Sequence, residues 1–104
     1  MKRPDIIHKI QAILRKVAPG AEVILYGSEA RGDATVDSDI DLLILVDKDK
    51  LTYKEITDIT YPLYDLELSD QVSISPLVYT RKQWLNRPFK TPFYINVINE
   101  GIRL

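Results

Sequence analysis

The segment DIDLLILV, residues 39–46, is the most apolar stretch of the chain, and it begins with two acids. Beyond its first three residues it is apolar on both faces, which is typical of a central strand covered on both sides. Asp39 and Asp41 stand at alternate positions, and alternate positions of a strand face the same side. Two neighbouring carboxylates repel each other unless one is protonated or a cation binds between them. The pair therefore predicts either a site for a hard divalent cation, above all Mg²⁺, or two solvated charges at a strand end.

Hydrophobic spacing predicts the elements around this strand. The expected helices cover residues 4–18 and 52–68, a short turn around Trp84 and a last segment from Phe93 to Gly101; the expected strands cover 23–26 and 72–79. Pro62 is expected to kink its helix, and Pro76 predicts an edge or a bulge because proline cannot donate to a neighbouring strand. The element order predicts an α+β fold in two layers, a small mixed sheet flanked by helices. A length of 104 residues allows a single domain, 1–104.

Composition disfavours several classes of function. The net charge of −1 lacks the basic excess that nucleic-acid or membrane binding needs, so direct nucleic-acid binding is not expected. The cations of RKQWLNRPFK surround Trp84 and Phe89, and a solvated turn with a buried tryptophan is favoured over a partner patch there. The chain has no cysteine, which excludes thiol catalysis and Cys-ligated zinc. With no apolar run long enough to span a bilayer, a cytoplasmic location is expected.

The turn YGSEARG, residues 26–32, precedes the acidic pair. Gly27 allows a phosphate to approach backbone N–H groups closely, and Ser28 is expected to cap a short helix. Arg31, one helical turn later, offers a bidentate donor to phosphate oxygens. The turn is not a Walker A loop, because no Gly-Lys-Ser/Thr follows it. Alone it fits an ordinary strand-to-helix turn, whereas next to Asp39 and Asp41 it indicates a phosphate site beside a metal site.

Together these residues, GSEARGDATVDSDIDLLI, resemble the signature of the polymerase-β-like nucleotidyltransferase superfamily: Gly-Ser, a ten-residue spacer, then Asp-x-Asp. The whole chain, including the closing FYINVINEGIRL, resembles the minimal nucleotidyltransferase family. The resemblance implies attack of an acceptor hydroxyl on the α-phosphate of ATP with release of pyrophosphate. The site residues that it implies are Gly27, Ser28, Arg31 and Ser38 for the nucleotide, with Gly32 shaping the turn, and Asp39 and Asp41 for catalysis and for Mg²⁺ or Mn²⁺.

The resemblance also implies a protein partner. Many minimal nucleotidyltransferases are antitoxins that act on a HEPN-type toxin, either by transferring AMP to a protein hydroxyl or by binding alone. Both alternatives stay open here, as does a homo-oligomer. An antibiotic-modifying role is disfavoured, because the chain lacks a second domain to build a drug pocket.

One expected residue is missing from the pattern. Active superfamily members carry a third carboxylate on a later strand, but the corresponding stretch QVSISPLVY presents Ser73 and Ser75 on the relevant face. Asp65 and Glu67 belong to the preceding helix. The third acid is therefore absent, displaced to Asp70, or supplied by a partner.

Overall fold

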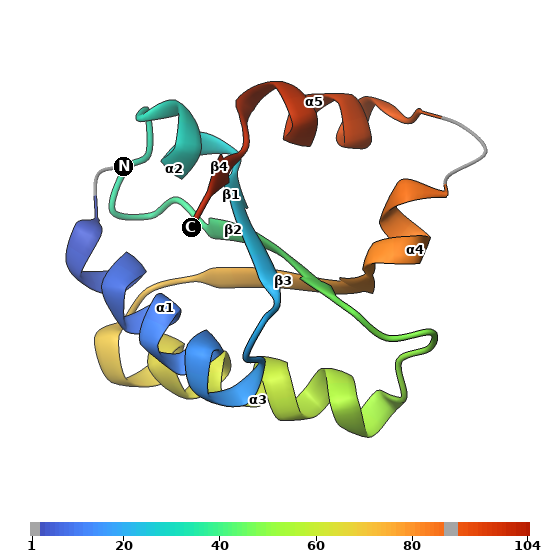
Figure 1. Cartoon of the computed structure of the whole chain (residues 1–104). Helices are drawn as coiled ribbons and strands as arrows, with labels where there is room; N and C mark the ends of the chain where they lie inside the picture. Colours follow the sequence, from blue (N-terminus) through green and yellow to red (C-terminus); the bar gives the residue numbers. More distant parts are fainter. Residues whose placement is uncertain (1–2, 87–89) are drawn as a thin grey trace.

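In the computed structural model, which describes residues 3–86 and 90–104, a four-stranded sheet carries helices on both faces (Figure 1). The elements are, in chain order, α1 (Pro4–Val17), β1 (Glu22–Tyr26), α2 (Ser28–Arg31), β2 (Ile40–Val46), α3 (Tyr53–Asp70), β3 (Ile74–Thr80), α4 (Arg81–Leu85), α5 (Pro92–Glu100) and β4 (Ile102–Arg103). The strand order is β3-β2-β1-β4, with β1 antiparallel to β2 and β4, and β2 parallel to β3. The predicted α+β fold with a mixed sheet flanked by helices is confirmed.

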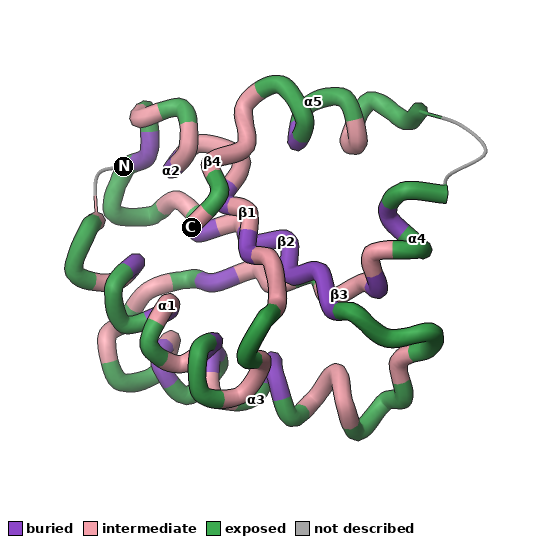
Figure 2. Tube along the Cα trace, viewed as in Figure 1, coloured by how far each residue is buried: buried purple, intermediate pink, exposed green. Residues whose placement is uncertain are grey.

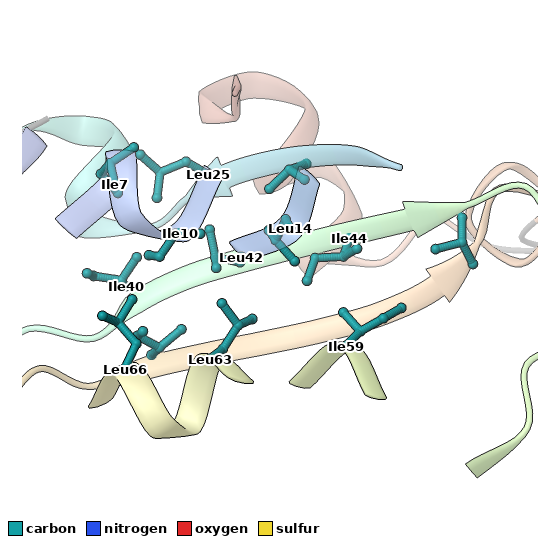
Figure 3. Close-up of a cluster of buried hydrophobic side chains, with 13 residues drawn as sticks. Ile7, Ile10, Leu14, Leu25, Ile40, Leu42, Ile44, Ile59, Leu63 and Leu66 are labelled. Carbon is teal, nitrogen blue, oxygen red and sulfur yellow. The ribbon is translucent and has the colours of Figure 1, made fainter. Parts of the chain in front are cut away.

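The strand β2 is the centre of the molecule, as its sequence predicts. All of its residues except Asp41 are buried, and Figure 2 shows β2 as a mostly buried segment in the middle of the molecule. Ile40, Leu42 and Ile44 pack with α1 and α3 in the larger core cluster (Figure 3). Leu43 faces the other side, where it packs in a smaller cluster with residues of α4 and α5. Full burial of such a side chain contributes about 1.5–3 kcal/mol, so the start of β2 is held firmly from both faces.

The helices α1 and α3 lie together on one face of the sheet because each has an apolar stripe. In α1, Pro4 occupies the first turn and the buried residues follow at helical spacing. The helix α3 begins with a capping box between Thr52 and Glu55, and it continues through Pro62. It ends where Gln71 adopts the left-handed conformation, with φ of 54°.

The strands β2 and β3 begin later in the structure than the sequence predicts. The strand β2 begins at Ile40, so Asp39 precedes it, and β3 begins at Ile74 rather than at residue 72. The later start of β3 follows from the longer α3, which ends at residue 70, and from the left-handed turn at Gln71. Pro76 lies on the edge strand, as predicted. A short fourth strand, β4, was not predicted; its two residues are too few to produce a pattern.

The remaining predictions concern the surface. Within residues 3–86 and 90–104, no helix combines the length and the apolarity needed to cross a membrane. Trp84, which lies in α4, is buried, as predicted, and its ring packs against Tyr94 of α5. Arg87 and Phe89, which belong to the basic stretch around it, lie outside the described residues.

Candidate active site

The predicted phosphate turn lies where β1 ends and α2 begins. Gly27 has φ of 74° and ψ of −155°, a conformation essentially restricted to glycine. It is the N-cap of α2, so the expectation that Ser28 caps this helix is wrong: Ser28 is the first helical residue. The short helix ends at Gly32, which is left-handed with φ of 82°. The turn thus folds back within a few residues and places Arg31 beside the end of β1.

Gly27 also lies directly against Asp41. A methyl group placed on Gly27 would lie 2.3 Å from Oδ2 of Asp41, which is far inside contact distance. The absence of a side chain at residue 27 therefore lets the turn and the acidic pair share one small space. The structure brings together these two halves of the signature.

Gly27→Ala is expected to damage both the fold and the site. The backbone conformation alone costs a non-glycine residue about 1–3 kcal/mol, and the new methyl group must displace the Asp41 carboxylate. We expect weaker resistance to urea and loss of nucleotide binding by calorimetry. Gly20→Ala is the matched control, because Gly20 also has a positive φ, 82°, but open space around it. Equal losses of nucleotide binding in the two variants would contradict the role of the close approach.

The environment of the acidic pair disfavours the charged form of Asp41. Asp41 is half-buried beside Tyr26 of β1, its register partner, whereas Asp39 is exposed just before β2. Burial raises the pKa of Asp41, the charge of Asp39 raises it further, and Arg31 lowers it. Burial and the charge of Asp41 together raise the pKa of Tyr26 to about 12, so this phenol stays neutral. Within the described residues, neither Asp39 nor Asp41 accepts a side-chain hydrogen bond or forms an ion pair.

Two carboxylates that act on each other at the start of β2, with no side-chain hydrogen bond or ion pair among the described residues, fit a hard divalent cation, which would offset their repulsion. The donor set is incomplete on its own: in the part of the chain that the structure describes, no three Asp, Glu, His or Cys side chains gather in a metal-binding arrangement. Further ligands must then come from phosphate oxygens, water or a partner.

The position of the expected third acid is occupied by a serine. Ser75 is the register partner of Asp41 in the parallel pair β2–β3, so both side chains face the same side of the sheet. Asp70 is the last residue of α3 and forms an ion pair with Lys9 of α1, 2.6 Å from Nζ to Oδ2. The carboxylate of Glu67 accepts the backbone N–H of Ile74, at 2.7 Å. Neither acid joins Asp39 and Asp41 in a metal-binding group.

The predicted phosphate donor Arg31 already has acidic partners. Its Nη1 lies 3.2 Å from each carboxylate oxygen of Glu100, and its Nε lies 3.3 Å from Asp33. Glu100 also accepts the N–H of Gly27, at 3.1 Å. Sequence reasoning missed Glu100, because it is 73 residues away from Gly27 along the chain. The only feature of the sequence that pointed to Glu100 was its position in the closing segment FYINVINEGIRL, which resembles the C-terminal segment of the family.

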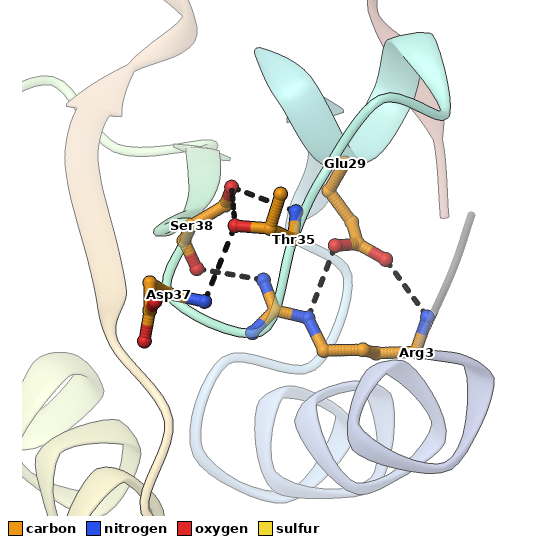
Figure 4. Close-up of polar contacts among 5 residues, drawn as sticks. All are labelled: Arg3, Glu29, Thr35, Asp37 and Ser38. Atoms are coloured by element: carbon orange, nitrogen blue, oxygen red, sulfur yellow. Dashed lines mark hydrogen bonds and ion pairs between the residues drawn. The ribbon is translucent and has the colours of Figure 1, made fainter.

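The loop between the turn and the acidic pair is fixed by a partly buried ion pair (Figure 4). Glu29 of α2 is fully buried and accepts the backbone N–H and the Nε–H of Arg3, at 2.9 and 3.1 Å. The other arm of the Arg3 guanidinium donates to the carbonyl of Ser38, at 2.7 Å. The hydroxyl of Ser38 accepts the N–H of Thr35, at 2.9 Å. Ser38 therefore lies in a braced turn directly before Asp39, with its hydroxyl engaged inside that turn.

Comparison with known proteins identifies the family. Residues 7–103 match the family described as nucleotidyltransferase domain. A protein of Methanocaldococcus jannaschii named "putative protein adenylyltransferase" is 39% identical over 82 residues, 79% of this chain and 76% of that protein.

Two solved structures have the same fold. One, named "putative minimal nucleotidyltransferase", has a TM-score of 0.65 and 25% identity, over 100% of this chain and 97% of that chain. The other is a toxin–antitoxin crystal structure with AMP-PNP, with a TM-score of 0.64 and 22% identity, over 92% of this chain and 69% of that chain. With the family match covering almost its whole length, this chain belongs to the nucleotidyltransferase domain family, and its resemblance to the minimal nucleotidyltransferases is confirmed.

Proposed function

We propose that this protein transfers AMP from ATP, with Mg²⁺, to a hydroxyl group of a protein partner, and that it serves as the antitoxin of a HEPN-type toxin. The observation that carries the proposal is the position of Asp41, which lies directly against Gly27 of the glycine turn and within electrostatic reach of Asp39. The relative named as a protein adenylyltransferase and the toxin–antitoxin neighbour crystallised with AMP-PNP support the acceptor class and the nucleotide.

Each part of the site has a task in this reaction. Asp39 and Asp41 would hold the cation, which when bound neutralises phosphate charge in an in-line displacement. The amides of the turn at Gly27 and Ser28 and the guanidinium of Arg31 would bind and orient the triphosphate. The acceptor oxygen forms a bond to the α-phosphorus while the bond from that phosphorus to the bridging oxygen breaks. Pyrophosphate leaves, and the acceptor proton passes to a base.

The two best-formed cavities described for the chain lie away from the acidic pair. Cavities of about 490 and 430 Å³ lie at the far end of β2, around Asp47 and Lys48. Neither is lined by Asp39 or Asp41. A small acceptor needs walls around it, whereas the surface of a partner protein supplies its own.

Ser75 favours a second candidate function. With serine at the register position of a third acid, the protein would neutralise its partner by binding alone. In this second function the protein has the same fold and the same partner, but it does not catalyse AMP transfer.

The decisive experiment mixes the purified protein with its HEPN-type partner, ATP and Mg²⁺, and follows the intact mass of the partner. We expect a gain equal to one or more AMP groups, absent when EDTA replaces Mg²⁺, since the acidic pair needs a cation to accept a triphosphate. Calorimetry of ATP in the same two buffers gives binding separately. An unmodified partner that still forms a stable complex would favour the binding-only function. Equal ATP affinity with and without EDTA would refute the metal role.

A further inference from the structure

The carboxylate of Glu100 occupies the position where the glycine turn would bind an anion. It accepts the N–H of Gly27 at 3.1 Å and the Nη1–H groups of Arg31 at 3.2 Å from each of its oxygens. One donor is a backbone amide of the turn, and the other is the turn's only arginine. A carboxylate and a phosphate group compete for such donors, because both are anions that accept charge-assisted hydrogen bonds.

The backbone of Glu100 is fixed, but its side chain has room to move. Gly101, the next residue, packs so tightly that a methyl group there would lie 2.5 Å from the carbonyl of Val97 and 2.7 Å from Cγ2 of Ile24. Ile102 then pairs with β1. These contacts fix the end of α5 against β1. The Glu100 side chain remains 23% exposed, so rotation about its own bonds can release the two donors without moving the helix.

The charges around the turn favour such an exchange. Asp33 and Glu100 both pair with Arg31, and the charges of Asp39, Arg31 and Glu100 all act on Asp41. A triphosphate that arrives with a divalent cation brings its own counter-charge for the acidic pair. It can then replace Glu100 on Gly27 and Arg31, which leaves the carboxylate free to be hydrated.

We propose that Glu100 is an internal competitor for the nucleotide phosphates: it holds Gly27 and Arg31 in the free protein and must release them when the triphosphate binds. This inference rests on the proposed function, because it needs ATP to bind at the turn. Its consequence is that Glu100 weakens the affinity for ATP and couples nucleotide binding to the C-terminal end of α5.

The test compares the affinity for ATP with Mg²⁺, by calorimetry, in the wild type and in Glu100→Gln. Glutamine keeps the size of the side chain but removes its charge, so we expect about tenfold tighter binding, which corresponds to about 1.4 kcal/mol. Adenosine, which lacks phosphates, should bind both proteins equally. Glu100→Asp keeps the charge but withdraws it by one methylene, and it should also tighten ATP binding.

Asp37→Asn is the control for general charge. It removes one negative charge from the exposed loop before Asp39, and the Asp37 carboxylate has no described contact with Gly27 or Arg31. Its ATP affinity should stay near that of the wild type. Thermal unfolding of each variant shows that it is folded.

The outcomes separate this inference from the proposed function. Tighter ATP binding by both Glu100 variants, but not by Asp37→Asn, supports the proposal that Glu100 competes with the nucleotide phosphates. Unchanged binding by Glu100→Gln, or equal tightening by Asp37→Asn, overturns it while the proposed function stands. Weaker or metal-independent binding by Glu100→Gln also overturns it and makes Glu100 part of the metal site. If no variant binds ATP, the proposed function fails, and the competitor fails with it.

Discussion

Asp41→Asn is expected to abolish AMP transfer and, at the same time, to stabilise the fold at neutral pH. Loss of one carboxylate from the pair removes the charge that holds the cation, and cation-derived stabilisation of a transition state is worth several kcal/mol. The transfer rate should therefore fall by about a thousandfold or more. The free energy of unfolding should rise, because asparagine carries no charge and so removes the cost of burying a carboxylate beside Asp39.

The stabilisation has a defined pH dependence. Burial, then the charge of Asp39, raises the pKa of Asp41 in the folded state. The ionised carboxylate is therefore less stable in the folded protein than in the unfolded chain. This destabilisation is absent below the ordinary pKa of an aspartate, about 3.9, grows as the pH rises through the raised pKa, and is constant above it. The advantage of Asp41→Asn should accordingly vanish in acid and grow as the pH rises through the raised pKa.

Urea unfolding at several pH values, with and without Mg²⁺, measures this effect. Mg²⁺ should stabilise the wild type through binding but leave Asp41→Asn unchanged. Asp37→Asn, an exposed substitution in the preceding loop, controls for the loss of one charge. If Asp41→Asn unfolds the protein at neutral pH, the pair has a structural role and the metal interpretation is wrong.

The parts of the fold that could be predicted are those in which a local pattern coincides with burial. The stretch from Ile40 to Val46 is apolar on both faces, and it is the strand buried on both faces. Pro76 indicated an edge, and β3 is one. A turn at Gly27 could be predicted from the glycine itself, and in the structure Gly27 has a positive φ and lies against Asp41.

The contacts that could not be predicted join residues far apart in the chain. Arg3 and Glu29 form a partly buried ion pair, although charged residues are mostly exposed. Glu100 reaches Gly27 only because the short strand β4 returns the chain to β1. Neither contact produces a periodic pattern in the sequence, because each is made by a single side chain with a distant part of the chain. The ion pair between Asp70 and Lys9 could not be predicted for the same reason, because the two residues lie on different helices.

Ser75→Asp is expected to raise the rate of AMP transfer. Ser75 and Asp41 are register partners on adjacent parallel strands, and such strands lie about 4.8 Å apart, so an aspartate at residue 75 would face the acidic pair. It would add a metal ligand and a base for the acceptor proton. General-base assistance typically contributes about 10²–10⁴-fold, which sets the size of the expected gain where the partner supplies no base of its own. Without Mg²⁺ the third charge should lower the stability of the fold, since it adds to the repulsion around Asp41.

The experiment follows AMP transfer to the partner by intact mass for the wild type, Ser75→Asp, Ser75→Asn and Asp70→Asn. Ser75→Asn is the matched control, because it adds nearly the same volume without the charge and should show no gain. Asp70→Asn should transfer as the wild type does, because Asp70 pairs with Lys9 rather than with the site. A fast wild type that Ser75→Asp does not accelerate would mean that the partner or the solvent removes the acceptor proton. Loss of transfer in Asp70→Asn would make Asp70 the third acid, which would require the end of α3 to move when the partner binds. A silent wild type made active by Ser75→Asp would show that serine at this one position separates a transferase from a protein that acts by binding alone.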